Sequence, residues 1–372
     1  MTNKFYKFLT LGALTLSISV AFTSCGDDDE DKPEPVIEPL ENTVFILNEG
    51  SWKANNSTLD IYHPYAEPPV LEKDVFSAVN GEKIGDTGQD LIAYGGRLYL
   101  SVWGSNYLAK LDLQGKVIEK YQFKADEGQP RRLAFDDKYI YVSTYGGKVA
   151  KFDTTSIAAP VAFVEVGNNP EGIAVKGNYL VVCNSQQTGA DGKSVPDNRI
   201  SIVDLSTFTL AKHITSEVYG NYQNVAVVKD SVYITYYTPS YSVEMLNLDI
   251  NKGTLTPTGA ATKLAPASYE GLLFCANVAT VYDENFNATT NTSFFVRDVT
   301  TGKDKAILDL SATPELATAT VYLFDIDYTS HDLYIGTTDY KTNGTIYHFD
   351  KDGKLLDKFE TSSISPSKAV IF

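Results

Sequence analysis

A pattern of four short strands recurs six times between residues 88 and 360. Each unit begins with a short polar segment and an apolar strand, turns into a Tyr-rich strand, and ends with two more strands, the first of which closes on an aspartate. A unit of about 40 to 50 residues with four strands and no helical apolar stripe is typical of a β-propeller blade. The six units span residues 88–123, 128–166, 167–215, 219–259, 267–309 and 320–360.

The two ends of the repeat region supply a seventh blade. Residues 364–372 have the pattern of a single inner strand, and residues 44–47 begin a set of three further strands. Pairing these segments would close the ring and leave no exposed sheet edge. We therefore expect an all-β fold over residues 43–372, a seven-bladed β-propeller with four-stranded blades, in which the N- and C-terminal strands share one blade.

Recurrent aspartates and two cysteines have structural explanations. A carboxylate at a strand end accepts hydrogen bonds from the backbone of the following turn, so we predict turn caps rather than catalytic acids. These aspartates are Asp112, Asp153, Asp204, Asp249, Asp298 and Asp350. Cys183 and Cys275 lie in apolar strands two units apart, beyond disulfide distance, and are predicted to be buried free thiols.

The first 24 residues have the features of a secretory signal peptide. Lys4 and Lys7 precede a mainly apolar, uncharged stretch over residues 8–22. That stretch of roughly 15 residues is shorter than the ~20 that a membrane-spanning helix needs. We expect residues 1–24 to be removed on export rather than to anchor the chain as a helix.

Residues 21–25 resemble a bacterial lipobox, with Cys25 as the lipidated N-terminus of the mature protein. Residues 25–42 contain five consecutive acidic residues and three prolines, which predicts an extended, solvated leash. An acidic run directly after a lipidated cysteine resembles the surface-export signal of Bacteroidetes lipoproteins. The expected location is the outer membrane, lipid-anchored and facing the exterior, with a periplasm-facing anchor as the alternative.

The charge of the chain argues against two classes of partner. The formal net charge of −16 becomes −18 once residues 1–24, which hold two lysines and no acid, are removed. A strongly acidic protein repels nucleic acids and anionic lipid surfaces. We therefore expect no nucleic-acid partner, and membrane attachment only through the N-terminal lipid.

Aligning the first strands of the blades places mostly polar residues at one position around the central channel. They are Gln89, Arg131, Glu171, Gln223, Glu270, Phe324 and Lys368, with Asp90 and Arg132 next to them. Such a ring either lines a solvated channel or forms a ligand-binding funnel. Aromatic residues on the loops between second and third strands would rim that funnel and stack on flat or saccharide-like ligands. They are Trp52, Trp103, Tyr145, Tyr237, Tyr241 and Tyr340, and the longest such loops are residues 184–199 and 282–293.

The histidines do not support an enzyme. His63 and His348 are placed on third strands, His213 on an outer strand and His331 in a turn at the far end of its blade, so they do not converge. We expect no enzymatic activity and no cofactor. The remaining possibility is a Ca²⁺ site, since carboxylates are its preferred ligands, although nearby Arg131, Arg132 and Lys368 would also neutralise such acids. Its candidate ligands are Asp90, Glu171, Glu270 and Asp325.

Several segments are similar to the YncE-like propeller lipoproteins of Bacteroidetes, the group that includes the cobalamin-binding BtuG proteins. They are residues 44–52, 55–59, 85–90, 128–131 and 168–173, and the likeness extends over residues 43–372. The resemblance implies a surface protein that binds cobalamin or a related corrinoid and delivers it to a TonB-dependent outer-membrane transporter. The alternatives are a glycan-binding accessory lipoprotein, a protein-docking propeller, or a Ca²⁺-dependent enzyme like a lactonase or lyase.

Either ligand class leads to a mutational expectation. Trp103 and Arg131 lie near the predicted funnel mouth. Replacing both with alanine is expected to weaken ligand binding and to leave the melting temperature nearly unchanged.

Overall fold

The computed structural model describes residues 43–215, 217–240, 242–267, 270–285 and 288–372. These residues form seven four-stranded antiparallel sheets, one two-stranded hairpin, the short helix α1 (Val75–Asn80) and the 3-10 helix η1 (Pro314–Thr318). No helix in these ranges is long and apolar enough to cross a membrane. Cys25, the rest of the predicted signal peptide and leash, and Tyr241 lie outside the described residues.

Each sheet is one blade, and its strands are named here from the inner strand outwards. Blade 1 consists of β30 (Pro366–Ile371), β1 (Val44–Asn48), β2 (Thr58–His63) and β3 (Val70–Glu72). Blade 2 consists of β4 (Gly88–Tyr94), β5 (Arg97–Val102), β6 (Tyr107–Leu111) and β7 (Val117–Gln122). Blade 3 consists of β8 (Pro130–Phe135), β9 (Tyr139–Thr144), β10 (Lys148–Asp153) and β11 (Ala162–Glu165).

The other four blades follow in chain order. Blade 4 consists of β12 (Pro170–Lys176), β13 (Tyr179–Asn184), β16 (Arg199–Asp204) and β17 (Thr209–Thr215). Blade 5 consists of β18 (Asn221–Val228), β19 (Ser231–Tyr237), β20 (Val243–Asp249) and β21 (Thr254–Gly259). Blade 6 consists of β22 (Lys263–Ala267), β23 (Leu272–Tyr282), β24 (Ala288–Asp298) and β25 (Lys303–Ala306). Blade 7 consists of β26 (Val321–Ile326), β27 (Leu333–Thr337), β28 (Thr345–Phe349) and β29 (Leu355–Glu360).

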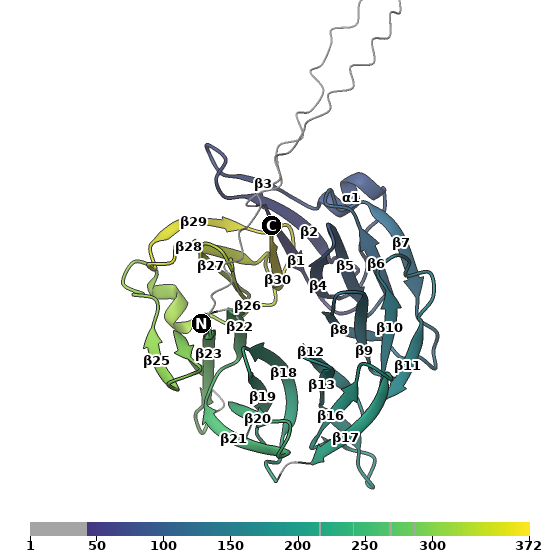
Figure 1. Ribbon diagram of the computed structural model, residues 1–372. Coiled ribbons are helices and arrows are strands. Elements are labelled where there is room, and N and C mark those ends of the chain that lie inside the picture. The colour runs from purple at the N-terminus through teal and green to yellow at the C-terminus, as the bar shows by residue number, and fades with distance from the viewer. Residues whose placement is uncertain (1–42, 216, 241, 268–269, 286–287) are drawn as a thin grey trace, which may run out of the picture. The chain divides into compact units, whose positions relative to one another are not determined.

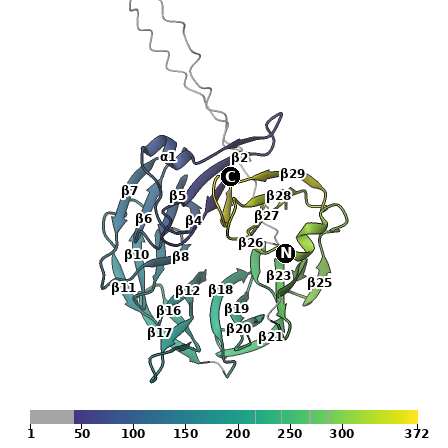
Figure 2. The same ribbon diagram turned by 180° about the vertical axis from the view of Figure 1, so that it is seen from behind.

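The inner strands form a closed ring. Each contacts the inner strand of the next blade, and β30 contacts both β4 and β26 (Figures 1 and 2). Blade 1 joins the two ends of the described chain, because β30 pairs with β1 through Phe45 and Val370 and through Ile46 and Ala369. The predicted all-β, seven-bladed propeller with shared terminal strands is confirmed.

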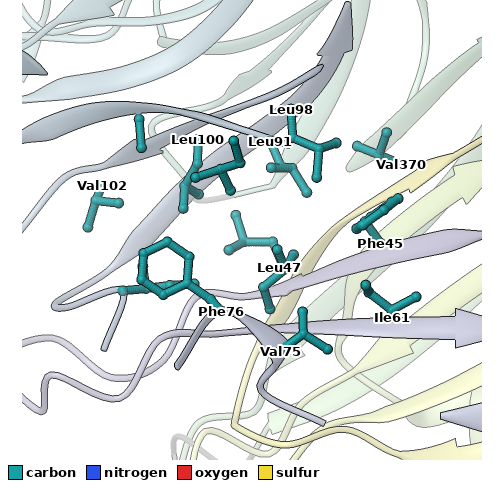
Figure 3. Close-up of a cluster of buried hydrophobic side chains, with 14 of the residues drawn as sticks. Phe45, Leu47, Ile61, Val75, Phe76, Leu91, Leu98, Leu100, Val102 and Val370 are labelled. Carbon is teal, nitrogen blue, oxygen red and sulfur yellow. The ribbon is translucent and has the colours of Figure 1, made fainter. Parts of the chain in front are cut away.

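Burial across a blade explains its sequence pattern. The second strand β5 is buried from Leu98 to Val102, whereas the outer strand β7 alternates between half-buried and exposed residues. Between blades 1 and 2, Phe45 and Leu47 pack against Leu91 and Leu98 in a fully buried cluster (Figure 3). Burying a side chain of this size contributes about 1.5–3 kcal/mol. The channel walls therefore rest on apolar layers that hold neighbouring blades together.

The structural roles predicted for the aspartates and cysteines are confirmed. The Asp112 carboxylate accepts hydrogen bonds from the backbone N–H groups of Gln114 and Lys116, at 2.9 Å each. The other five aspartates accept equivalent bonds in the turns that follow their third strands. Cys183 and Cys275 are both buried free thiols.

The predicted boundaries of blade 6 are wrong. Its inner strand is β22, so the apolar run 272–275 belongs to the second strand. The error arose because β22 has the sequence Lys-Leu-Ala-Pro-Ala, in which small residues and a proline replace the usual β-branched pattern. Glu270 therefore lies in the turn between β22 and β23, at the end of the blade opposite the predicted funnel. Its carboxylate is 3.1 Å from Nε2 of His331.

The two longest predicted loops contain regular structure. Residues 184–199 include a hairpin of β14 (Gln186–Thr188) and β15 (Ser194–Pro196). Most of residues 282–293 extends the ladder between β23 and β24, which pairs Tyr282 with Ala288 at its end. Both segments therefore contain paired strands where the sequence predicted loops.

Candidate functional site

A backbone bulge defines the mouth of the channel. In six of the seven inner strands the pairing with the second strand shifts register near the first residues, and β22 alone has no such shift. The bulge places Gln89, Arg131, Glu171 and Gln223 at equivalent positions, as predicted. In β26 and β30, however, the equivalent residues are Tyr322 and Ser367. The predicted alignment of Phe324 and Lys368 is therefore wrong by two residues and by one residue, respectively.

An ion pair connects three blades at this mouth. The Arg131 guanidinium donates from Nε to Glu171 Oε2 at 3.1 Å and from Nη2 to Oε1 at 2.9 Å. Nη1 of Arg131 donates to Gln89 Oε1, and the Tyr145 hydroxyl donates to Glu171 Oε1. The side chains of Arg131 and Glu171 are only 16% and 6% exposed. A bidentate pair of this kind fixes the orientation of both side chains.

Three aromatic side chains lie beside that ion pair, and we call Trp52, Trp103 and Tyr145 the aromatic platform. The ring centroids are 6.4 Å apart for Trp52 and Trp103, and 6.3 Å apart for Trp103 and Tyr145. The Arg131 guanidinium lies 4.5 Å from the Tyr145 ring centroid and 5.8 Å from that of Trp103. Cation–π contact therefore adds to the hydrogen bonds that hold Arg131 in place.

The platform offers both an apolar face and a polar group. Trp52 is 65% exposed, although most large apolar side chains of this protein are buried. The Trp103 indole N–H is buried and has no hydrogen-bond acceptor among the described residues. A buried donor without an acceptor costs about 1–3 kcal/mol. A ligand carbonyl or hydroxyl at this point would remove that cost.

The loop that carries Trp52 is held by local backbone geometry. Gly50 has φ of 78°, and a Cβ there would lie 2.6 Å from Asn56 Oδ1, so glycine is needed. The same Asn56 oxygen accepts a hydrogen bond from the Ser51 backbone N–H at 2.8 Å. The Lys53 ammonium lies 4.2 Å from the centroid of the Trp52 ring. These contacts orient Trp52 before any ligand arrives.

Two other predicted rim residues belong to blades 5 and 7. Tyr237 is exposed at the end of β19, and Tyr340 is exposed in the loop that follows β27. Burial, followed by the charges of Tyr237 and Glu49, raises the pKa of Tyr340. Tyr340 also meets Tyr322 edge to face, at 6.0 Å between centroids, and the Tyr322 hydroxyl donates to Glu49 Oε2 at 2.6 Å. The alignment of the blades by sequence missed Tyr322 because it was two residues out in β26, whose bulge lies at the same second residue as in β4.

Below the mouth, the channel holds a cavity of about 210 Å³. Residues from all seven inner strands line it, including Asp90, Arg132, Lys263, Asp325 and Lys368. Pockets for drug-sized ligands have volumes of about 300–1,000 Å³. A corrinoid is larger still, so only a small molecule or one group of a larger ligand fits inside.

The acids considered for Ca²⁺ have other partners. Asp90 accepts hydrogen bonds from the N–H groups of Leu91 at 3.0 Å and Leu133 at 2.9 Å, and burial raises its pKa. Asp325 accepts from Lys368 Nζ at 2.6 Å and from the Ala369 N–H at 2.9 Å. Each carboxylate thus ties its blade to the next. Among the described residues, no group of three or more His, Cys, Asp or Glu side chains gathers as a metal site requires.

The histidines are as dispersed as predicted. His63 ends β2 and is 2.8 Å from Glu72, and His348 on β28 is 3.0 Å from Asp332. His213 lies on the outer strand β17, and His331 lies in the turn after β26. None of the four is among the residues that line the channel cavity.

Several solved structures share the propeller fold. A proposed 6-phosphogluconolactonase from Bacteroides fragilis NCTC 9343 is 13% identical with a TM-score of 0.58, covering 91% of this chain and 100% of that one. The Pan2 WD40 domain of Neurospora crassa is 9% identical, with a TM-score of 0.51 and coverage of 91% and 87%. A streptogramin B lyase is 11% identical, with a TM-score of 0.52 and coverage of 75% and 84%. These similarities show the fold alone.

The family comparison is more specific than these structures. No curated protein matches the chain. Residues 42–363, which include nearly all of the propeller, match a family described as a domain of unknown function, DUF5074. The match covers well over half of the sequence. The chain therefore belongs to the DUF5074 family, and its fold is the seven-bladed propeller described above.

Proposed function

We propose that this protein is a non-enzymatic capture protein that binds its ligand across the mouth of the channel. The observation that supports this most is the aromatic platform beside an Arg131 that Glu171 holds rigidly. Its Trp52 is exposed, and its Trp103 N–H has no acceptor within the described part of the chain. A preformed site loses little conformational entropy on binding. The four dispersed histidines leave the mouth without an imidazole for acid–base chemistry.

The proposed ligand is cobalamin or a related corrinoid. Such a ligand is flat and rich in amides, so it matches aromatic faces together with the side-chain groups of Gln89, Gln223 and Trp103. Because the cavity holds only about 210 Å³, the ligand would lie over the mouth and also contact Tyr237 of blade 5 and Tyr340 of blade 7. The resemblance of residues 44–59 to the cobalamin-binding propellers supports the same ligand.

The proposed setting is the outer surface of the outer membrane. The lipobox-like residues 21–25 and the acidic leash support lipid anchoring at Cys25 and exposure to the exterior. A captured corrinoid would then pass to a TonB-dependent transporter in the same membrane. A leash of this composition would let the propeller reach such a partner.

Glycan capture is the second candidate. Trp52 and Trp103 are tilted by 48° relative to each other, and exposed indole rings of this kind stack on the apolar faces of sugar rings. A glycan would use the platform alone, whereas a corrinoid would also reach Tyr237 and Tyr340. Replacing Tyr340 with alanine is therefore expected to weaken corrinoid binding and to leave glycan binding unchanged.

The two tryptophans provide an internal reporter of binding. They are the only two in the chain, and both belong to the platform. Iodide should quench the fluorescence of the free protein through the exposed Trp52. We expect a bound glycan or corrinoid to protect this residue, so that the quenching constant falls as ligand is added.

Two variants check that the signal comes from the platform. In Trp52→Phe the ligand-dependent protection should largely disappear, because Trp103 is already shielded. Tyr179→Phe is the matched control, since Tyr179 is exposed and begins β13 at the turn from β12, at the end of blade 4 opposite the mouth. Ligand binding that leaves iodide quenching unchanged in the natural protein would place the site elsewhere and refute the proposal.

A further inference from the structure

The cavity below the mouth has an excess of positive charge. Arg132, Lys263 and Lys368 line it together with Asp90 and Asp325. Lys368 is neutralised by Asp325, from which it is 2.6 Å away. Asp90 accepts two backbone N–H groups, and its carboxylate is the strongest attraction on Arg132. Three cations therefore face two carboxylates in the cavity, and among the described residues Lys263 is the cation without a carboxylate at ion-pair distance or a dominant attraction to one.

Lys263 has no ion-pair partner. Its ammonium makes no hydrogen bond or salt bridge with the described residues, and its one recorded contact is the Tyr322 ring, 4.9 Å from Nζ to the centroid. Burial, followed by the positive charge of Arg132, lowers the pKa of Lys263 to about 8. The opposing attraction from Glu49 is smaller than either effect.

The Arg132 guanidinium also has N–H donors without an acceptor among the described residues. Nη1 of its guanidinium donates to the Gln89 carbonyl at 2.9 Å, and no other hydrogen bond of the guanidinium is formed within the described part of the chain. A guanidinium carries five N–H donors. Burial alone would lower its pKa, but Asp90 and Glu171 outweigh burial and keep it raised. Arg132 therefore remains a cation with several free donors.

We propose that the channel cavity binds a small oxyanion, a carboxylate or a phosphate group, between the Lys263 ammonium and the Arg132 guanidinium. An oxyanion accepts charge-assisted hydrogen bonds from both groups and removes the repulsion between them. The cavity of about 210 Å³ admits such an ion with a few waters, because one water takes about 30 Å³ in the liquid.

This site is separate from the aromatic platform and does not rest on the proposed capture function. The oxyanion is either a free ion from solution or a charged group of a ligand that also covers the mouth. The two sources share the same chemistry, and competition distinguishes them. If saturating inorganic phosphate weakens cyanocobalamin binding, the ligand inserts its own group, whereas independent binding indicates a free ion.

The direct test measures the melting temperature of the full chain in inorganic phosphate and in acetate, against chloride at matched ionic strength. A ligand that binds only the folded state raises this temperature in a saturable way. We expect saturation with phosphate or acetate and not with chloride. Lys263→Met should weaken the apparent affinity about tenfold or more, the effect of losing one charge-assisted bond.

Matched variants separate this role from a structural one. Lys305→Met removes an exposed lysine of the same blade, on β25, and should leave the anion effect unchanged. Lys263→Arg keeps the charge and should retain most of the affinity. Lys263→Met itself should fold, because it removes a desolvated cation that has no ionic partner.

The pH dependence gives an independent readout. Because only protonated Lys263 binds the anion, acetate affinity should fall by up to about tenfold between pH 7 and pH 9 in the natural protein. Lys263→Arg and Lys263→Met should both give flat profiles over this range. The groups that face Lys263 and also influence its charge are Arg132, Glu49, Asp325, Lys368 and Tyr322.

Titration of these neighbouring groups does not produce the predicted fall in acetate affinity between pH 7 and pH 9. The pKa values of Arg132, Lys368 and Tyr322 are all raised from their usual alkaline values, so these groups keep their charge states across the range. The absence of any saturable phosphate or acetate effect in the natural protein would overturn the proposal. An effect that persists at full strength in Lys263→Met would overturn it as well.

Discussion

Replacing Arg131 with alanine is expected to lower the free energy of unfolding by about 3–5 kcal/mol, the cost of leaving a buried charge unpaired. Glu171 would keep only the Tyr145 hydroxyl as a side-chain donor, although its side chain is 6% exposed. This differs from the expectation from sequence, in which replacing Trp103 and Arg131 together leaves the melting temperature nearly unchanged. Urea unfolding followed by far-UV circular dichroism measures the change.

Two further variants separate ion-pair loss from the general effect of mutation. Lys358→Ala removes a half-exposed pair with Glu315 and should cost less than about 1 kcal/mol. The double variant Arg131→Met with Glu171→Met removes both charges and should recover much of the lost stability. If Arg131→Ala costs no more than Lys358→Ala, the ion pair does not stabilise the mouth as we describe.

Deleting residues 366–372 is expected to abolish cooperative unfolding. These residues include β30, the inner strand of blade 1, which contacts the inner strands of both neighbouring blades. Their loss would expose the edge of β1 and open the ring between β4 and β26. Near-UV circular dichroism during a thermal scan should show no native signal and no sharp transition. A shortened chain that melts cooperatively would mean that ring closure does not hold the fold together.

A point substitution tests the same closure without deleting chain. Val370 is 9% exposed and packs in the cluster with Phe45, so Val370→Asp buries a carboxylate and should cost several kcal/mol. Val281 is 64% exposed on β23, and Val281→Asp should stay within about 0.5 kcal/mol. Equal effects of the two substitutions would show that the contact between β30 and β1 is unimportant for stability.

Much of the fold could be predicted because its signals are local. The turn after Asp112 depends on a carboxylate and the next four residues, and β5 shows its burial in its own apolar sequence. The start of blade 6 was predicted wrongly because its inner strand lacks an apolar strand pattern. Ala265, Pro266 and Ala267 do not resemble a strand. Its pairing with β23 makes this segment a strand, and its own residues carry no alternating or β-branched pattern that would announce it.

The site was less predictable than the fold, because bulges and contacts between blades decide it. Gln89, Arg131 and Glu171 were found since their strands carry the bulge at the same place in sequence. Tyr322 was missed because the predicted alignment was two residues out in β26, whose bulge lies at the same second residue as in β4. Lys263 was missed because the predicted blade 6 began after β22. That Arg131 binds Glu171 while Arg132 has no ion-pair partner among the described residues depends on distances between blades, which no local pattern encodes.

Isothermal titration of the full chain with cyanocobalamin tests the proposed capture function most directly. We predict one-to-one binding that Trp52→Ala weakens by about tenfold or more, since a stacked indole contributes on the order of 1–2 kcal/mol. Trp52 makes no contact that stabilises the core, so the melting temperature of this variant should be unchanged. No heat with cyanocobalamin, or binding that Trp52→Ala leaves intact, would contradict corrinoid capture on the aromatic platform.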